Sequence, residues 1–120
     1  MSKRDAGREE RITMEIIVDC HDEEERSMGW YSYLEDHLSF PFDAACIAQR
    51  ETSPLGKDEK VRVIGMAAED TCRSEMFVRI EWSGRHLAVP LAQLRPLGVT
   101  AEESEAVADW HYWVRQGYQC

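Results

Sequence analysis

The 120-residue sequence lacks the long apolar segments that membrane proteins carry. No apolar run reaches the roughly 18 residues that a membrane-spanning helix requires. The first eleven residues, MSKRDAGREER, are charged and contain no apolar core of the kind found in secretory signal peptides. We therefore expect a protein that does not span or contact a membrane and that resides in the cytoplasm.

The sequence also lacks paired cysteines. Its four cysteines, Cys20, Cys46, Cys72 and Cys120, are far apart and form no CxxC motif. This spacing gives no support for a zinc ribbon or a thioredoxin-like redox centre. In a reducing cytoplasm we expect four free thiols, which commonly act as small buried apolar side chains.

Motifs of catalysis and nucleotide binding are missing as well. The chain has no G-x-S-x-G nucleophile motif and no glycine-rich phosphate loop, and no Cys–His pairing can be established from sequence. Cys20 and His21 are adjacent, which in most backbones points their side chains apart. His37 and His111 lie near predicted core faces, where a packing role is more common than a ligand role. We expect a protein that is not an enzyme.

Negative charge is abundant. The net charge is −9 and the isoelectric point is near 4.9. Such a balance disfavours nucleic acids and anionic membranes, because phosphate contacts need a basic surface. It favours cations, a basic protein partner or simple solubility.

The acidic residues concentrate around one predicted helix. Seven acids and a single base, Arg26, lie between Asp19 and Asp36. In the same window apolar or aromatic residues recur at helical spacing, at Trp30, Tyr33, Leu34, His37 and Leu38. This pattern predicts an amphipathic helix over about 23–38 that packs one face on a core. Asp22 is its expected N-cap, and Pro41 follows its end.

The remaining segments predict an α+β fold in one domain spanning residues 1–120. Residues 1–8 are expected to be a disordered polar lead and 9–39 to form N-terminal helices, with a strand at 16–19 as the alternative to the first of them. Between 43 and 97, strands at 43–50, 60–67, 75–82 and 86–91 favour a small SH3-like antiparallel β-barrel. A last helix at 100–116 begins with a Thr100–Glu103 capping box.

The acidic clusters raise the question of metal binding. Hard cations such as Ca²⁺ take six to eight oxygen ligands from carboxylates, carbonyls and water. No EF-hand loop is present, because a twelve-residue frame from Asp19 has Glu24 where glycine is needed and Trp30 where the last acid is needed. A solvated acidic surface is the simpler interpretation of these residues by themselves.

Three candidate groups of oxygen ligands can still be defined. The end of the predicted helix offers unsatisfied carbonyls beside Glu35, Asp36 and Ser39. The connection after 60–67 offers Glu69, Asp70 and Glu75. The start of the helix offers Asp22, Glu23 and Glu25, but the positive end of the helix dipole opposes a cation there, so this group ranks last.

Several distinctive blocks resemble the CcbP-type bacterial calcium-binding proteins. They are EIIVDC, EEERSMGWYSYLEDHLSFPFDAAC, V-R-V-x-G-M-A-x-E-D-x-C, EMFV, VPLAQL and A-V-A-D-W-H-Y-W-V-x-Q-G-Y, and together they cover about Arg11 to Tyr118. The resemblance implies a small acidic cytoplasmic protein that binds Ca²⁺ without an EF-hand, through surface acidic side chains, as a buffer or signalling protein.

Two functional hypotheses follow. The first is an intracellular calcium buffer or sensor that uses the three carboxylate groups above. The second is an acidic SH3-like interaction module that binds a basic protein and no specific metal. Ion type separates them, because a formed calcium site prefers Ca²⁺ to Mg²⁺, whereas a generic acidic surface responds similarly to both.

Overall fold

The computed structural model describes residues 5–18, 20, 22–50, 53–73 and 75–116. The elements follow in this order: α1 (Ala6–Arg11), the π-helical η1 (Ile12–Ile16), α2 (Glu23–His37), β1 (Phe42–Cys46), β2 (Lys60–Met66), the 3₁₀ turn η2 (Glu69–Cys72), β3 (Phe77–Trp82), β4 (Arg85–Pro90), the 3₁₀ turn η3 (Leu91–Gln93), β5 (Leu94–Leu97) and α3 (Ala101–Arg115). The predicted α+β class is therefore confirmed.

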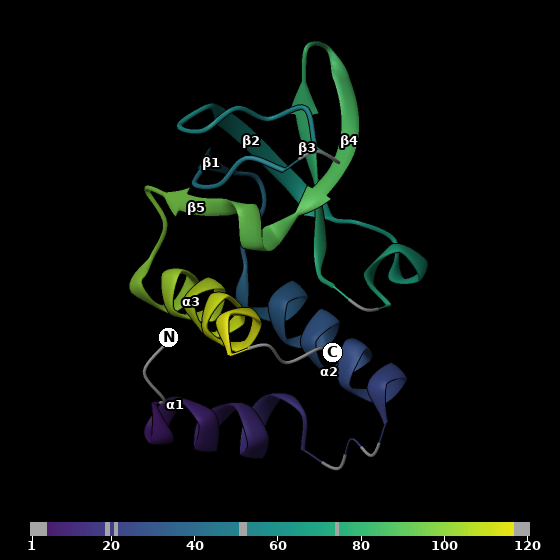
Figure 1. Cartoon of the computed structure of the whole chain (residues 1–120), viewed down its shortest axis with the longest axis vertical. Helices are drawn as coiled ribbons and strands as arrows, with labels where there is room; N and C mark the ends of the chain where they lie inside the picture. Colours follow the sequence, from purple (N-terminus) through teal and green to yellow (C-terminus); the bar gives the residue numbers. More distant parts are fainter. Residues whose placement is uncertain (1–4, 19, 21, 51–52, 74, 117–120) are drawn as a thin grey trace.

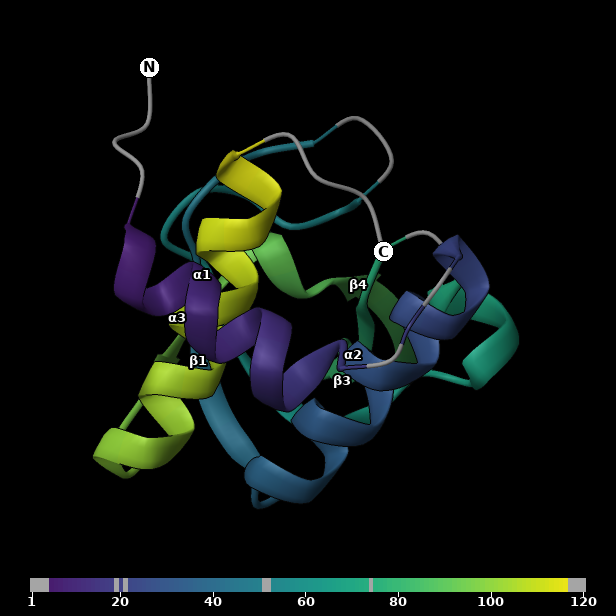
Figure 2. The ribbon, with the colours of Figure 1, turned by 90° about the horizontal axis from the view of Figure 1, so that it is seen from below.

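The elements form three layers (Figure 1). The sheet is one layer, α2 and α3 lie side by side beneath it, and α1 with η1 lies beneath that helix pair. Figure 2, seen from below, shows α1 and η1 crossing the outer side of the pair. The main core lies between the sheet and the α2–α3 pair. The opposite, outer side of the pair is covered by α1 and η1.

The sheet has the strand order β4-β3-β2-β1-β5, and every neighbouring pair is antiparallel. The SH3-like barrel is not confirmed, because the sheet is not closed. Within the described residues β4 and β5 are the two edges, although only η3 separates them in sequence. Strand β5 was not expected, and its Pro96 is tolerated because an edge strand leaves one row of backbone groups unpaired.

The N-terminal region differs from expectation. Helix α1 begins at Ala6 with Asp5 as N-cap, so the disordered lead predicted for residues 1–8 is wrong for 5–8, and residues 1–4 lie outside the described part. The alternative strand at 16–19 is wrong for the described residues, because Ile16 ends η1; Asp19 is outside the description. No helix in the described residues is long and apolar enough to cross a bilayer.

Tryptophans fill the contact between α2 and α3. Trp30 and Trp110 are almost fully buried, and their ring centroids lie 5.0 Å apart in an edge-to-face arrangement. The Trp113 ring centroid lies 5.9 Å from that of Trp30. Aromatic pairs of this kind contribute about 0.5–1.5 kcal/mol each beyond their burial. The predicted apolar face of α2 is thus confirmed at Trp30 and Leu34.

Local capping signals were predicted correctly. The Asp22 carboxylate accepts a hydrogen bond from the Glu25 N–H at 2.8 Å, and Thr100 forms the capping box with Glu103. Cys46 and Cys72 are buried free thiols. The Cys20 thiol donates to the Glu25 carbonyl at 3.3 Å, and Cys120 lies outside the described residues. These caps fix where α2 and α3 begin, and therefore where the acidic first turn of α2 lies.

Candidate cation-binding site

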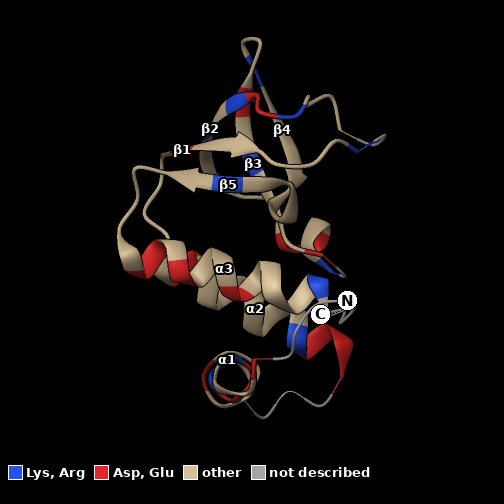
Figure 3. Cartoon of the chain, turned by 60° about the vertical axis from the view of Figure 1, so that its left-hand side comes forward, with Lys and Arg blue, Asp and Glu red and all other residues tan. Residues whose placement is uncertain are grey.

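Charge is segregated between the two halves of the molecule. Residues 42–97, which contain the sheet, carry eight acidic and eight basic residues. The whole net charge of −9 therefore belongs to the remaining, mainly helical segments. Figure 3 shows acidic residues along α2, α3 and α1. A cation is consequently attracted to the helical side of the molecule.

An acidic cleft opens between the first turn of α2 and η2. It has a volume of about 460 Å³. Its walls are contributed by two segments that lie more than forty positions apart, and its lining consists of Asp22, Glu23, Glu24, Ser27, Met28, Glu69, Asp70 and Arg73. Members of two carboxylate groups that were considered separately in the sequence thus line one cleft: Asp22 and Glu23 from one group, and Glu69 and Asp70 from the other.

A buried serine joins the two walls. Ser27 is 1% exposed, and its hydroxyl is shared between the carbonyl of Glu23, at 2.9 Å, and the carbonyl of Arg73. The first carbonyl belongs to α2 and the second follows η2. This hydroxyl therefore holds η2 against α2 and sets the width of the cleft.

The electrostatics of the cleft are mixed. The side chains of Glu23, Glu24, Glu69 and Asp70 are exposed, so their charges are well hydrated. The Arg73 guanidinium lies 3.5 Å from the Asp70 carboxylate, but both side chains are largely exposed, and such surface pairs contribute about 0–1 kcal/mol. The α2 N-terminus adds a partial positive charge. The carboxylates outnumber these positive contributions.

The donor chemistry fits a hard cation, but the geometry is not a finished cage. Carboxylates and carbonyls are the ligands that Ca²⁺ takes. Within the described residues, however, no three Asp, Glu, His or Cys side chains come close enough together to hold a metal ion. Binding in the cleft would require the exposed carboxylates to rotate inward.

The other candidate residues lie outside this cleft. Glu35 and Asp36 are exposed near the end of α2, and the Ser39 N–H donates to the Glu103 carboxylate at 2.8 Å. Glu75 forms a two-pronged ion pair with Arg50, with N–O distances of 3.2 and 3.0 Å. Glu25 lines a neighbouring hollow beside Cys20 and Met28. Their roles as calcium ligands stay predictions.

Sequence reasoning missed three features of the cleft. Nothing local indicates that η2 packs beside the first turn of α2, because that depends on the hydrogen bond between Ser27 and residue 73. Arg73 lies three positions after Asp70, a helical spacing that could have indicated their contact. Glu24, which belonged to the acidic run, lines the cleft together with Glu23.

Comparisons with known proteins point to one family. A family model for CcbP-type proteins, described as calcium binding, matches residues 10–114. Comparison with curated proteins gives no significant match. The crystal structure of Anabaena CcbP is 40% identical, with a TM-score of 0.85 over 98% of this chain and 96% of that one. A calcium-binding protein in its calcium-binding form is 39% identical, with a TM-score of 0.86 over 98% of both chains.

Proposed function

The chain belongs to the CcbP family of calcium-binding proteins, and we propose that it binds Ca²⁺ without an EF-hand, as an intracellular calcium buffer or sensor. One observation carries the choice of site. Carboxylates from α2 and from η2 line a single cleft, although the two segments are far apart in sequence. We therefore propose this cleft as the site at which Ca²⁺ is taken up.

The residues of the cleft would have different roles in Ca²⁺ binding. Glu23 and Glu24 would approach the ion from α2, and Glu69 and Asp70 would approach it from η2. Asp22 keeps one carboxylate oxygen on the Glu25 N–H, so it would contribute only its remaining lone pairs. Ser27 would act indirectly by fixing η2 against α2. Arg73 would compete with the ion for Asp70.

The open cleft also favours Ca²⁺ over Mg²⁺. Calcium accepts irregular arrangements of six to eight oxygens, whereas Mg²⁺ requires near-octahedral geometry and gives up water reluctantly. Exposed carboxylates on two separate elements can satisfy the first requirement by rotation but are poorly arranged for the second. This preference separates a calcium site from a generic acidic surface.

The acidic charge supports the proposal that the protein binds neither nucleic acid nor membrane. The lack of a catalytic motif in the sequence supports the proposal that it is not an enzyme. A cytoplasmic location and a bacterial source are proposed from the family resemblance. The alternative function, an acidic interaction module for a basic protein, is favoured by the charge segregation described above.

The test is calorimetric titration of the metal-free chain with Ca²⁺ in physiological salt and excess Mg²⁺. The cleft variant Glu23→Gln/Asp70→Asn is compared with the control Glu35→Gln/Asp36→Asn, which removes the same charge from the other end of α2. We expect saturable binding by the wild-type chain, at least tenfold weakening in the cleft variant and little change in the control.

The possible results distinguish a wrong site assignment from a wrong proposed function. If the control variant weakens binding and the cleft variant does not, the site belongs to the end of α2. If the wild-type signal disappears in excess Mg²⁺, the chain has no specific calcium site.

A further inference from the structure

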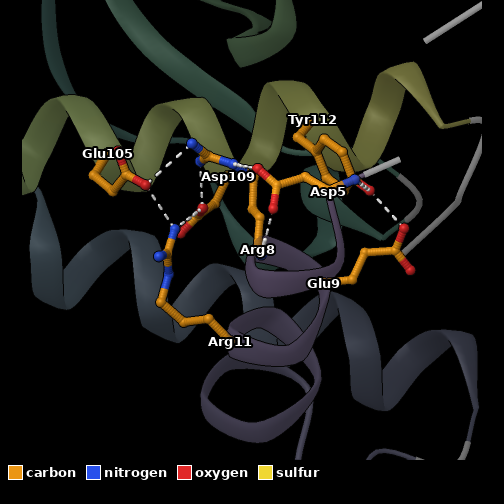
Figure 4. A network of polar contacts seen from close by, with 7 residues as sticks. All are labelled: Asp5, Arg8, Glu9, Arg11, Glu105, Asp109 and Tyr112. Atoms are coloured by element: carbon orange, nitrogen blue, oxygen red, sulfur yellow. Dashed lines mark hydrogen bonds and ion pairs between the residues drawn. The ribbon is translucent and has the colours of Figure 1, made fainter. Parts of the chain in front are cut away.

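A buried carboxylate in α3 is neutralised by the N-terminal helix. Asp109 is fully buried, and its Oδ1 lies 2.6 Å from Nη1 of Arg8 and is also paired with Nη2 of Arg11. Its Oδ2 accepts a hydrogen bond from the Tyr33 hydroxyl at 3.2 Å. Figure 4 shows both guanidiniums directed from α1 to this carboxylate. Both ion pairs of Asp109 in the described structure therefore come from α1.

Further polar contacts extend this interface. Glu105, one turn before Asp109 on α3, lies 3.1 Å from Arg8 and 2.7 Å from Arg11. At the other end, the Tyr112 hydroxyl accepts from the backbone N–H of residue 5 at 2.8 Å and donates to the Glu9 carboxylate at 2.5 Å. Over two turns, α3 thus presents side-chain oxygen atoms that contact polar groups of α1 and its N-cap (Figure 4).

The attachment of α1 is polar rather than apolar. Helix α1 contributes no buried residue, whereas α3 contributes seven. Apolar packing begins only in η1, where Ile12 and Ile16 are buried. Departure of α1 alone withdraws no residue from the core, whereas departure of η1 withdraws Ile12 and Ile16 from it. Whatever replaces the two elements must therefore supply aliphatic side chains and also a cation for Asp109, because an unpaired buried charge is costly.

We propose that the outer face of the α2–α3 pair is a docking surface for an arginine-bearing helix of a basic partner protein, and that α1 and η1 fill it in cis as an autoinhibitory clasp. The clasp specifies the partner's chemistry. It presents two arginines three residues apart, followed by aliphatic side chains one and five positions after the second arginine, as in Arg8, Arg11, Ile12 and Ile16.

Replacement of the clasp by such a helix exchanges one pair of arginines for another. Asp109 and Glu105 would keep two guanidinium partners, so no buried charge would be left unpaired. The negative charge of the helical side would attract the two guanidiniums of such a helix. What the partner must overcome is the tether, which holds α1 at an effective concentration on the order of millimolar.

At the end of the surface that contacts η1, Gly29 of α2 leaves room for a helix backbone to approach closely. A Cβ atom on Gly29 would lie 2.6 Å from the Ile16 carbonyl oxygen and 3.3 Å from Sγ of Cys20. The end of η1 therefore touches the α2 backbone itself, at a place where only glycine leaves room. A partner helix could make the same close backbone contact at Gly29.

The experiment uses full-length protein and a synthetic peptide of residues 5–17, DAGREERITMEII. A matched peptide carries glutamine at both arginine positions. Binding is measured by fluorescence anisotropy on the wild-type chain, on the Arg8→Gln/Arg11→Gln variant and on the control Arg62→Gln/Arg79→Gln, which removes the same charge from exposed sheet positions. Hydrogen exchange of the wild-type chain is recorded with and without excess arginine peptide.

The arginine peptide should bind the clasp variant at least tenfold more tightly than it binds the wild-type chain or the control, because the cis ligand then competes less. The glutamine peptide should bind all three weakly. In the wild-type chain, excess arginine peptide should accelerate exchange of residues 8–16 and leave α2 and α3 protected. This measurement decides the question even if the clasp variant fails to fold.

Three results would overturn the proposal. They are equal binding of the two peptides to the clasp variant, unchanged exchange of residues 8–16 under excess peptide, and a concentration-dependent wild-type dimer in which a second copy fills the surface.

Discussion

The carboxylate of Glu103 accepts a hydrogen bond from the backbone N–H of Ser39 at 2.8 Å, although 64 positions separate the two residues. The same carboxylate accepts the Thr100 N–H at 3.0 Å, and the Thr100 hydroxyl accepts the Glu103 N–H at 3.1 Å. Glu103 therefore caps its own helix and also fixes the chain that leaves α2. A residue of a local capping box thus also makes a long-range contact that stabilises the tertiary structure.

Replacement of Glu103 by alanine should lower the free energy of unfolding by about 2 kcal/mol, because it removes half of a capping box and leaves the Ser39 N–H without its acceptor. The neighbouring Glu102→Ala is the control, since the Glu102 side chain is largely exposed. Its effect should stay within about 0.5 kcal/mol. Urea unfolding of both variants measures the difference, and equal effects would contradict the tertiary role.

The stability contributed by Glu103 should depend on pH. Hydrogen bonds from Thr100 and then from Ser39 lower the pKa of Glu103 in the folded protein. The ionised form is thus favoured by folding, so the contribution is present above the ordinary glutamate pKa of about 4.3 and is lost as pH falls through the lower folded-state value. Unfolding midpoints measured between neutral and acid pH should fall less steeply in Glu103→Gln than in the wild-type chain.

Gly29 in α2 and Gly7 in α1 should respond oppositely to replacement by alanine. At Gly29 an added Cβ would lie 2.6 Å from the backbone oxygen of Ile16, which cannot move without shifting η1. At Gly7 the nearest atom is the Asp5 carboxylate oxygen at 3.7 Å, an ordinary contact. Thermal unfolding should show clear destabilisation in Gly29→Ala, whereas Gly7→Ala should be neutral or gain up to about 1 kcal/mol from helix propensity. Destabilisation by both would point to a shared effect on α1 instead.

Features that depend on neighbouring residues were predicted well from the sequence. The Asp22 cap and the Thr100–Glu103 box each act over a few positions, and they place the starts of α2 and α3 correctly. The apolar spacing of Trp30 and Leu34 likewise predicted the buried face of α2.

Features that depend on distant residues were missed. Strand β5 is short and contains Pro96, and it forms because β1 offers it a partner edge. The docking of α1 against α3 depends on Asp109, which lies about a hundred positions from its partner Arg8. Proximity in sequence grouped Glu75 with Asp70, whereas the carboxylate of Glu75 pairs with Arg50. Long-range ion pairs of this kind leave no periodic pattern in a single sequence.

The width of the acidic cleft should depend on Ser27. Replacement of Ser27 by alanine removes the hydroxyl that links the carbonyls of residues 23 and 73, so the two walls lose their connection. We expect at least threefold weaker Ca²⁺ binding by calorimetry, with the helix content of the protein retained in circular dichroism. Ser32→Ala, an exposed serine on the same helix, serves as control. Unchanged affinity in Ser27→Ala would mean that ion binding does not require the two walls to be held together.

The ionisation of Tyr33 should report on the charges beneath α1. Burial and then the carboxylate of Asp109 together raise the pKa of Tyr33 to about 12, and the guanidinium of Arg11 opposes that rise. Asp109→Asn should therefore lower the Tyr33 pKa, and Arg11→Gln should raise it. Because the folded-state value lies above the unfolded one, the associated stability is complete below about pH 10 and is lost as pH rises through the folded-state pKa.

Spectrophotometric titration of each variant, with the Tyr33→Phe titration subtracted to isolate this residue, measures both shifts. Opposite signs would establish that Asp109 and Arg11 act on Tyr33 as charges. Shifts of the same sign in both variants would show instead that each substitution acts by loosening the packing of α1, because greater solvent access to the Tyr33 hydroxyl lowers its pKa whichever charge is removed.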